Sequence, residues 1–130
     1  MVLGATLTAS TFVSQGHGRL TVQFDRKPTD DELARVETAA NAKVSEGAEV
    51  LEFEMEREEA EGHFGSQMYD LFPVPATVTR LRIVRIPDWN INCCVEPHVE
   101  GTTQVGRIKL GRPRFRNSRR ELELEFDLTD

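Results

Sequence analysis

Cysteine is scarce in this sequence of 130 residues: Cys93 and Cys94 are the only two, and they are adjacent. Neighbouring cysteines are poorly placed to bridge each other, which excludes a disulfide framework and leaves metal binding or simple burial. No apolar run approaches the roughly 18 residues of a membrane span, and the N-terminus lacks the basic and apolar regions of a signal peptide. We therefore expect a cytoplasmic protein that makes no membrane contact.

Three glycine-rich motifs are also missing. The sequence has no G-x-x-x-x-G-K-[ST], G-x-G-x-x-G or G-x-S-x-G pattern, which excludes the usual phosphate-loop, dinucleotide-binding and serine-hydrolase sites. A nucleophilic pair of Cys94 and His98 stays open, with Asn90 and Asn92 as the nearest side chains to orient the imidazole. With 38% hydrophobic residues, residues 1–130 fit one globular domain.

Charge is abundant but unevenly distributed around a net value of −6. Residues 26–70 contain 13 acidic and 5 basic side chains, whereas residues 80–120 contain 10 basic and 3 acidic ones. This asymmetry indicates a basic surface on an acidic body, which suits the phosphate backbone of a nucleic acid. A solvated strand face explains the same pattern equally well.

The first half of the chain alternates between strand and helix signals. Residues 1–18 are rich in Ser and Thr and read as a loose strand followed by a turn, and residues 20–24 alternate in polarity like a half-buried strand. Thr29 with Glu32 three positions later is typical of a capped helix start, and Gly47 is a typical helix end. The sequence therefore predicts a strand pair followed by a helix.

The second half continues with strands and one short helix. We expect a strand at 51–55, a helix at 56–63 ended near Gly62 or Gly65, a strand at 81–86, and a hairpin of 107–116 with 121–128 around Asn117-Ser118. In that hairpin Arg114 and Arg116 can pair with Glu121, Glu123 and Glu125, an alternative to nucleic-acid contact. The elements predict an α+β fold in two layers, with one mostly antiparallel sheet and helices on one side.

Cys94 and His98 stand four residues apart, so a thiolate and an imidazole can reach one metal ion. Zinc takes Cys sulfur and His nitrogen tetrahedrally. The C-x-x-x-H pair is weak evidence by itself, because a buried Cys and an exposed His give the same spacing. His17, in a glycine-flanked turn, and His63, at a helix end, are expected to face solvent, although either could serve as a third ligand.

The order and spacing of several short motifs resemble the small archaeal AlaX proteins, which are free-standing relatives of the alanyl-tRNA synthetase editing domain. That domain shares its fold with the editing domain of threonyl-tRNA synthetase. The similar segments cover nearly the whole chain and are Thr8-Ala9-Ser10-Thr11-Phe12-Val13, residues 19–28, Arg57-Glu58-Glu59-Ala60-Glu61 with Phe64-Gly65, residues 68–75, residues 88–92, Cys94-x-x-x-His98 and residues 105–110.

The resemblance implies a zinc-dependent hydrolase that cleaves serine, or glycine, from the 3′ terminal adenosine of mischarged alanine tRNA. In such a family Cys94 and His98 are zinc ligands. Ser10 and Thr11 occupy the segment beside the substrate pocket, where a placed hydroxyl can read the seryl side chain. The basic hairpin residues are expected to bind the tRNA and are Arg107, Lys109, Arg112 and Arg114.

Family members also carry H-x-x-x-H on an N-terminal helix, whereas no His precedes His17 here. Residues 1–130 therefore read as a single editing-type domain that is N-terminally truncated relative to the family, with an incomplete zinc site. Three explanations stay open: a start assigned too late or a shortened chain, an inactive paralogue or fragment that binds tRNA or a protein partner, or replacement ligands from Cys93, His17 or His63. Loss of a helix would expose apolar sheet surface, which predicts a homodimer.

Overall fold

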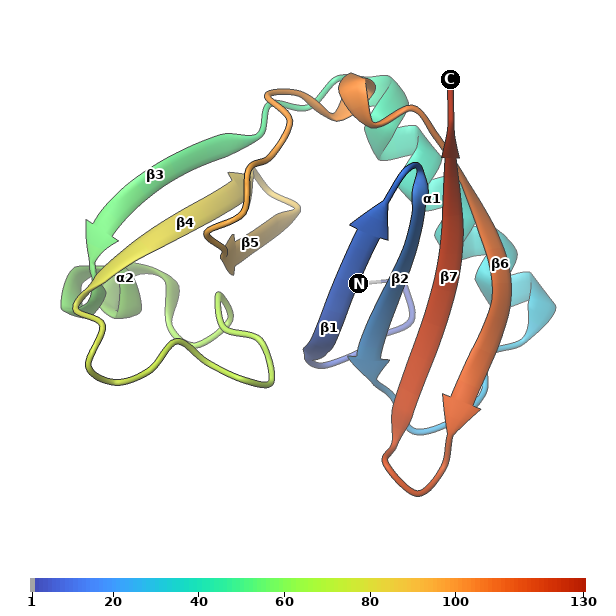
Figure 1. Cartoon of the computed structure of the whole chain (residues 1–130), viewed down its shortest axis with the longest axis horizontal. Coiled ribbons are helices and arrows are strands. Elements are labelled where there is room, and N and C mark those ends of the chain that lie inside the picture. Colours follow the sequence, from blue (N-terminus) through green and yellow to red (C-terminus); the bar gives the residue numbers. More distant parts are fainter. Residues whose placement is uncertain (1) are drawn as a thin grey trace.

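The computed structural model describes residues 2–130 and divides the strands between two antiparallel sheets (Figure 1). One sheet has the strand order β1-β2-β7-β6 and the other β3-β4-β5. The elements in chain order are β1 (Thr8–Ser14), β2 (His17–Gln23), α1 (Asp30–Glu46), β3 (Leu51–Glu56), α2 (Arg57–Phe64), β4 (Arg80–Ile86), β5 (Asn90–Cys93), the 3-10 turn η1 (Thr102–Val105), β6 (Arg107–Arg116) and β7 (Glu121–Thr129).

The α+β class and the antiparallel pairing are confirmed, but the strands form two sheets where one was expected. The chain crosses between the sheets at one place, where Glu49 and Gly101 form an isolated bridge. There Thr102 closes the junction: its hydroxyl donates to the carbonyl of Lys43 at 2.7 Å and accepts from the N–H of Ala48 at 2.9 Å. Side-chain hydrogen bonds and a single bridge thus replace a continuous ladder between the sheets.

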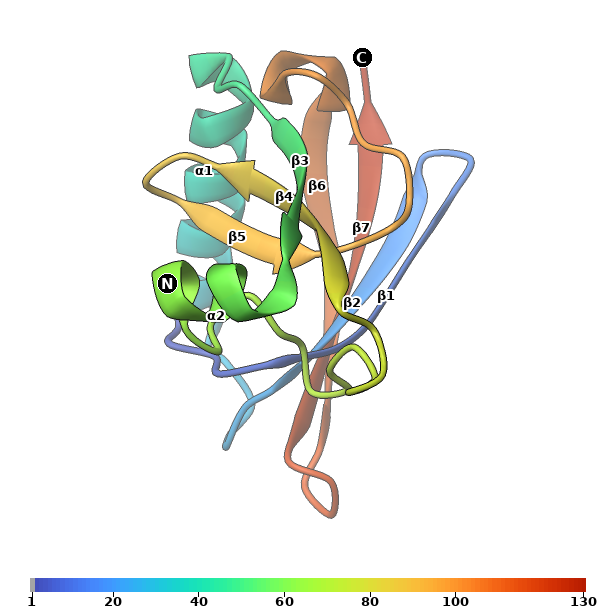
Figure 2. The same ribbon diagram turned by 90° about the vertical axis from the view of Figure 1, so that its left-hand side faces the viewer.

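Helix α1 begins and ends where its capping residues predict. Thr29 and Glu32 form a reciprocal capping box, and Gly47 ends the helix with a left-handed φ of 68°. The helix lies beside β6 (Figures 1 and 2). Its Asn41 side chain donates to the carbonyl of Ile108 at 2.7 Å and accepts from the N–H of Ile108 at 2.8 Å. Polar helix side chains therefore satisfy backbone groups of this sheet edge.

The smaller sheet carries the core of the second half. Ala60, Met68, Leu81 and Ile83 are buried together, and α2 supplies the first of them. The short helix extends to Phe64 and is capped by Gly65, one of the two expected ends. Side chains on the other face of β3 are exposed glutamates, because residues alternate between the faces of a strand. This exposed face receives the loop that follows β5.

The C-terminal hairpin forms as predicted. Arg116 lies opposite Glu121, the turn runs through Asn117-Ser118, and Arg116 also reaches Glu123 at 3.8 Å. A register shift between Leu110 and Pro113 interrupts the ladder, as expected for a proline that has no N–H to donate. In residues 2–130 no helix is both long and apolar enough to cross a membrane.

Candidate functional site

The loop from Cys94 to His98 leaves the end of β5 on the exposed face of the smaller sheet. The N–H of Cys94 donates to the carbonyl of Arg82 at 3.2 Å, one step beyond the last residue of β5. Cys93 faces the other way and packs against the core cluster, where burial raises the pKa of its thiol. Strand alternation therefore separates the two cysteines, and Cys94 is the one that shares a face with the loop.

His98 is held by a carboxylate from β3. Its Nδ1 lies 3.2 Å from Oε1 of Glu52, and the guanidinium of Arg82 donates to Oε2 of Glu52 at 2.8 Å. The same guanidinium donates to the carbonyl of Val95 at 2.8 Å. Two strands thus fix both ends of the loop through one arginine.

The carboxyl group of Glu52 is ionised at neutral pH. The hydrogen bond from Arg82 lowers its pKa below the ordinary value, and the charges of Arg82 and His98 act in the same direction. A carboxylate can only accept hydrogen bonds, so the shared proton belongs to His98. In a neutral ring this leaves the lone pair on Nε2.

The donor atoms of this loop fit zinc in chemistry but are few. Cys94 sulfur and His98 nitrogen are ligands that zinc prefers, and a carboxylate behind a ligating imidazole is a common arrangement around metals. Within residues 2–130 no group of three or more His, Cys, Asp or Glu side chains is arranged to hold a metal ion. His17 instead pairs with Asp127 at 2.8 Å, and His63 is exposed in the last turn of α2.

One buried polar atom lies on the same face as Cys94. The side-chain nitrogen of Asn92 donates to Asp70 at 3.1 Å, but its oxygen is buried and has no partner among the described residues. Burial raises the pKa of Asp70, and the hydrogen bond from Asn92 opposes this shift. The orienting role that the sequence left open for Asn92 has no contact with His98 in its support, since the imidazole contacts Glu52 instead.

Ser10 and Thr11 lie in a different part of the molecule. Both are exposed on β1 and line a hollow of about 340 Å³ together with Phe12, Arg19 and Arg116. Glu123 forms the floor charge of this hollow, 3.5 Å from Arg19. Among the described residues, its lining includes neither Cys94 nor His98. The structure therefore does not join the predicted substrate residues and the predicted metal ligands in one pocket.

The four predicted tRNA-binding residues are exposed along β6, the edge strand of the larger sheet. They form no ion pair within residues 2–130, whereas the neighbouring Arg116 contacts Glu123. In the register Lys109 lies opposite Asp127 and Arg114 opposite Glu123, so an acidic strand borders this basic one. The residues of the basic row are Arg107, Lys109, Arg112 and Arg114.

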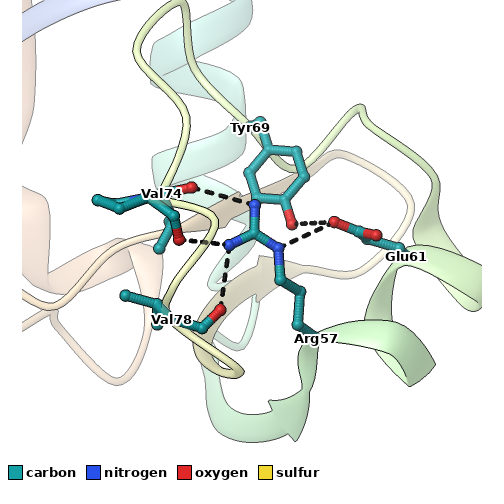
Figure 3. A network of polar contacts seen from close by, with 6 residues as sticks. Arg57, Glu61, Tyr69, Val74 and Val78 are labelled. Atoms are coloured by element: carbon teal, nitrogen blue, oxygen red, sulfur yellow. Dashed lines mark hydrogen bonds and ion pairs between the residues drawn. The ribbon is translucent and has the colours of Figure 1, made fainter.

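An arginine network organises the segment between α2 and β4, and sequence reasoning did not find it. Arg57 donates to the carbonyls of Val74 at 3.0 Å, Pro75 at 2.6 Å and Val78 at 3.1 Å (Figure 3). Its remaining nitrogen donates to Glu61, which also accepts from the hydroxyl of Tyr69 at 2.7 Å. No periodic pattern signals these contacts, because their acceptors are backbone carbonyls far along the chain.

The chain is similar to one region of a much larger enzyme. It is 34% identical over 110 residues to alanine-tRNA ligase of Methanopyrus kandleri, covering 84% of this chain and 12% of the ligase. The ligases of Saccharolobus islandicus and Pyrococcus abyssi are 34% and 35% identical, each over 72% of this chain and 10% of the ligase. The chain is a domain related to alanine-tRNA ligase. No family model matches it.

This ligase-related domain spans about a tenth of the length of the curated relatives that it matches. The relationship to alanyl-tRNA synthetase that the motif order implied is thereby confirmed, and so is the archaeal character of the resemblance. The activity of the whole ligases belongs to those enzymes.

Proposed function

We propose that the ligase-related domain is a cytoplasmic hydrolase that removes serine, and secondarily glycine, from the 3′ terminal adenosine of mischarged alanine tRNA. The observation that carries the proposal is the Cys94–His98 loop, fixed to β3 and β4 by Glu52 and Arg82, in a chain related to alanine-tRNA ligase. The product would be free serine and uncharged tRNA, a proofreading reaction in translation.

Zinc is the proposed cofactor. Cys94 sulfur and His98 nitrogen would hold it from this chain, as two of the four donors that zinc usually takes. When bound, zinc supplies a Lewis acid that polarises a carbonyl or lowers the pKa of a water molecule. The ester bond to tRNA is activated, so modest polarisation is sufficient for its hydrolysis.

The other predicted residues would recognise the substrate. A site that hydrogen-bonds the seryl hydroxyl can distinguish serine from alanine, whereas an apolar pocket rejects an added hydroxyl poorly. Ser10 and Thr11 offer exposed hydroxyls for this purpose. The exposed cations of the basic row on β6 would contact tRNA phosphates, because each exposed cation near a phosphate releases a counterion on binding.

Deacylation of seryl, glycyl and alanyl esters of alanine tRNA, measured beside the zinc content per chain, tests the proposal. We expect the seryl ester to be cleaved fastest, the alanyl ester to be spared, and a chelator to abolish cleavage. Cys94→Ala and His98→Asn should lose zinc and at least about 100-fold in rate, since each removes a proposed ligand.

Cys93→Ala is the matched control, because Cys93 packs against the core and should keep both zinc and rate. Full activity in Cys94→Ala would contradict the role of the loop. Unchanged serine removal by the double variant Ser10→Ala and Thr11→Val would remove the proposed hydroxyl contact.

A second candidate function is binding of tRNA, or of a protein partner, without hydrolysis. The observation that favours it is the basic row on β6, whose four cations form no ion pair with other described residues. Binding of this kind should weaken steeply with salt and be indifferent to chelators, whereas the hydrolase should respond to chelators.

We also propose that two copies associate through β1, the other edge of the larger sheet. This strand contains no charged residue, and its Phe12 and Val13 side chains are 53% and 57% exposed. Uncharged edge strands with exposed apolar side chains are prone to pair with another strand.

A further inference from the structure

Three polar side chains from separate parts of the chain meet at His98. The ring Nδ1 lies 3.2 Å from Glu52, and Glu52 accepts from Arg82 at 2.8 Å through its second oxygen. Both oxygens of the carboxylate are therefore engaged, one by the imidazole and one by the guanidinium. A carboxylate held at two points has little freedom to turn away from the ring.

Arg82 ties this contact to the other proposed ligand. Its guanidinium donates to the carbonyl of Val95, and its own backbone carbonyl accepts from the N–H of Cys94. The residue that orients Glu52 therefore also holds the beginning of the loop that carries Cys94 and His98. One arginine links the positions of both side chains.

Neighbouring glutamates on the same face of β3 are engaged elsewhere. Glu54 accepts from Arg80 at 3.0 Å, and Glu56 accepts from Arg80 at 2.8 Å. Glu52 is the member of this row that contacts His98 within residues 2–130. The contact is thus specific to one position of an otherwise similar strand face.

We propose that Glu52, oriented by Arg82, is a positioning residue that fixes His98 in the Nδ1–H tautomer and makes Nε2 the nitrogen through which His98 binds zinc. The zinc part of this inference rests on the proposed function. The tautomer is a property of the chain itself, since an ionised carboxylate accepts a proton-bearing nitrogen and repels a lone pair.

The side chains of Glu52, Arg82 and His98 are 32%, 34% and 28% exposed. Partly exposed ion pairs of this kind contribute little to the stability of a fold. Their removal should therefore leave the melting temperature nearly unchanged while it changes the state of one imidazole. A purely structural ion pair would produce no such tautomer change.

The test uses the metal-free, uniformly ¹⁵N-labelled chain at about pH 8.5, where an ordinary imidazole is neutral. Two-bond proton–nitrogen correlation spectra report the tautomer of each of the three histidines, and His98→Asn assigns the signal. We expect His98 to show the Nδ1–H pattern in the wild type. In Glu52→Ala it should shift toward the Nε2–H form, which histidine favours in water.

Glu54→Ala is the matched control: the same residue type is removed from the same strand face, but its partner is Arg80. It should leave the His98 signal unchanged. Titration of each variant with zinc sulfate then measures affinity, and Glu52→Ala should bind about 10- to 100-fold more weakly than the wild type. Arg82→Lys should give an intermediate loss, since an ammonium cannot hold Glu52 and Val95 in one planar fork.

An Nε2–H tautomer in the wild type, or a His98 signal that does not respond to Glu52→Ala, overturns the inference. Equal zinc affinity in the wild type and Glu52→Ala overturns it as well. A wild-type chain that has the Nδ1–H tautomer but takes up no zinc would instead count against the zinc hydrolase, while the positioning of His98 by Glu52 would stand.

Discussion

Arg57 stands at the start of α2 and donates to three backbone carbonyls of the segment that leads to β4. Its side chain is 19% exposed, so these carbonyls have limited access to water as an alternative partner. Arg57→Ala should lower the free energy of unfolding by roughly 2 kcal/mol, a typical loss for hydrogen bonds to a charged donor. Urea denaturation measures this value, and limited proteolysis should show faster cleavage between residues 70 and 79.

Arg35→Ala provides the control for Arg57→Ala, since Arg35 is exposed on α1 and forms no ion pair within residues 2–130. It should change stability by less than about 0.5 kcal/mol. If Arg57→Ala behaved like this control, the contacts in Figure 3 would not stabilise the segment.

At the scale of elements, the cap of α1 predicts how stability changes with pH. Hydrogen bonds from Arg26 and from the backbone of Thr29 lower the pKa of Glu32 from 4.5 to about 2. The folded chain therefore binds this proton less readily than the unfolded chain, so the contribution is complete above about pH 4.5 and is lost as the pH falls toward 2. Chemical denaturation across this window measures the loss.

Glu32→Gln separates charge from capping. Glutamine can still accept from the N–H of Thr29, as a capping box allows, but it does not titrate. The stability difference between wild type and Glu32→Gln should shrink as the pH falls from about 4.5 to 2. A difference that is constant over this range would show that the charge of Glu32 is not the stabilising feature.

Elements with strong local signals were predictable, and contacts between them were not. Thr29, Glu32 and Gly47 marked α1 correctly because caps act within a few residues of sequence. The division into two sheets was missed because alternation shows which face of a strand is buried, but not which strands pair. The contact of His98 with Glu52 escaped for the same reason, since 46 positions separate them and strand pairing brings them together. The roles of Ser10, Thr11 and the basic row stay predictions.

At the scale of the whole molecule, β1 predicts association. Light scattering after size-exclusion chromatography should show a rising share of dimer as concentration increases, because the exposed edge strand can pair with a second copy. Val13→Lys should shift the chain to monomer by placing a charge at that edge. Val95→Lys is the control: Val95 is also exposed, at 76%, but lies in the loop after β5.

A wild-type chain that stays monomeric at high concentration would contradict the β1 interface. Equal association of Val13→Lys and the wild type would place the contact on another surface. These outcomes are independent of zinc, so the assembly can be tested apart from the reaction.

The side chains that α1 lays along β6 set a limit on this assembly. Asn41 occupies both backbone groups of Ile108, and Glu37 accepts from the N–H of Leu110 at 2.9 Å. A strand arriving at that edge would find these groups already engaged. The larger sheet can therefore grow at only one of its two edges, so that pairing through β1 ends with two copies and gives a closed dimer instead of a fibre.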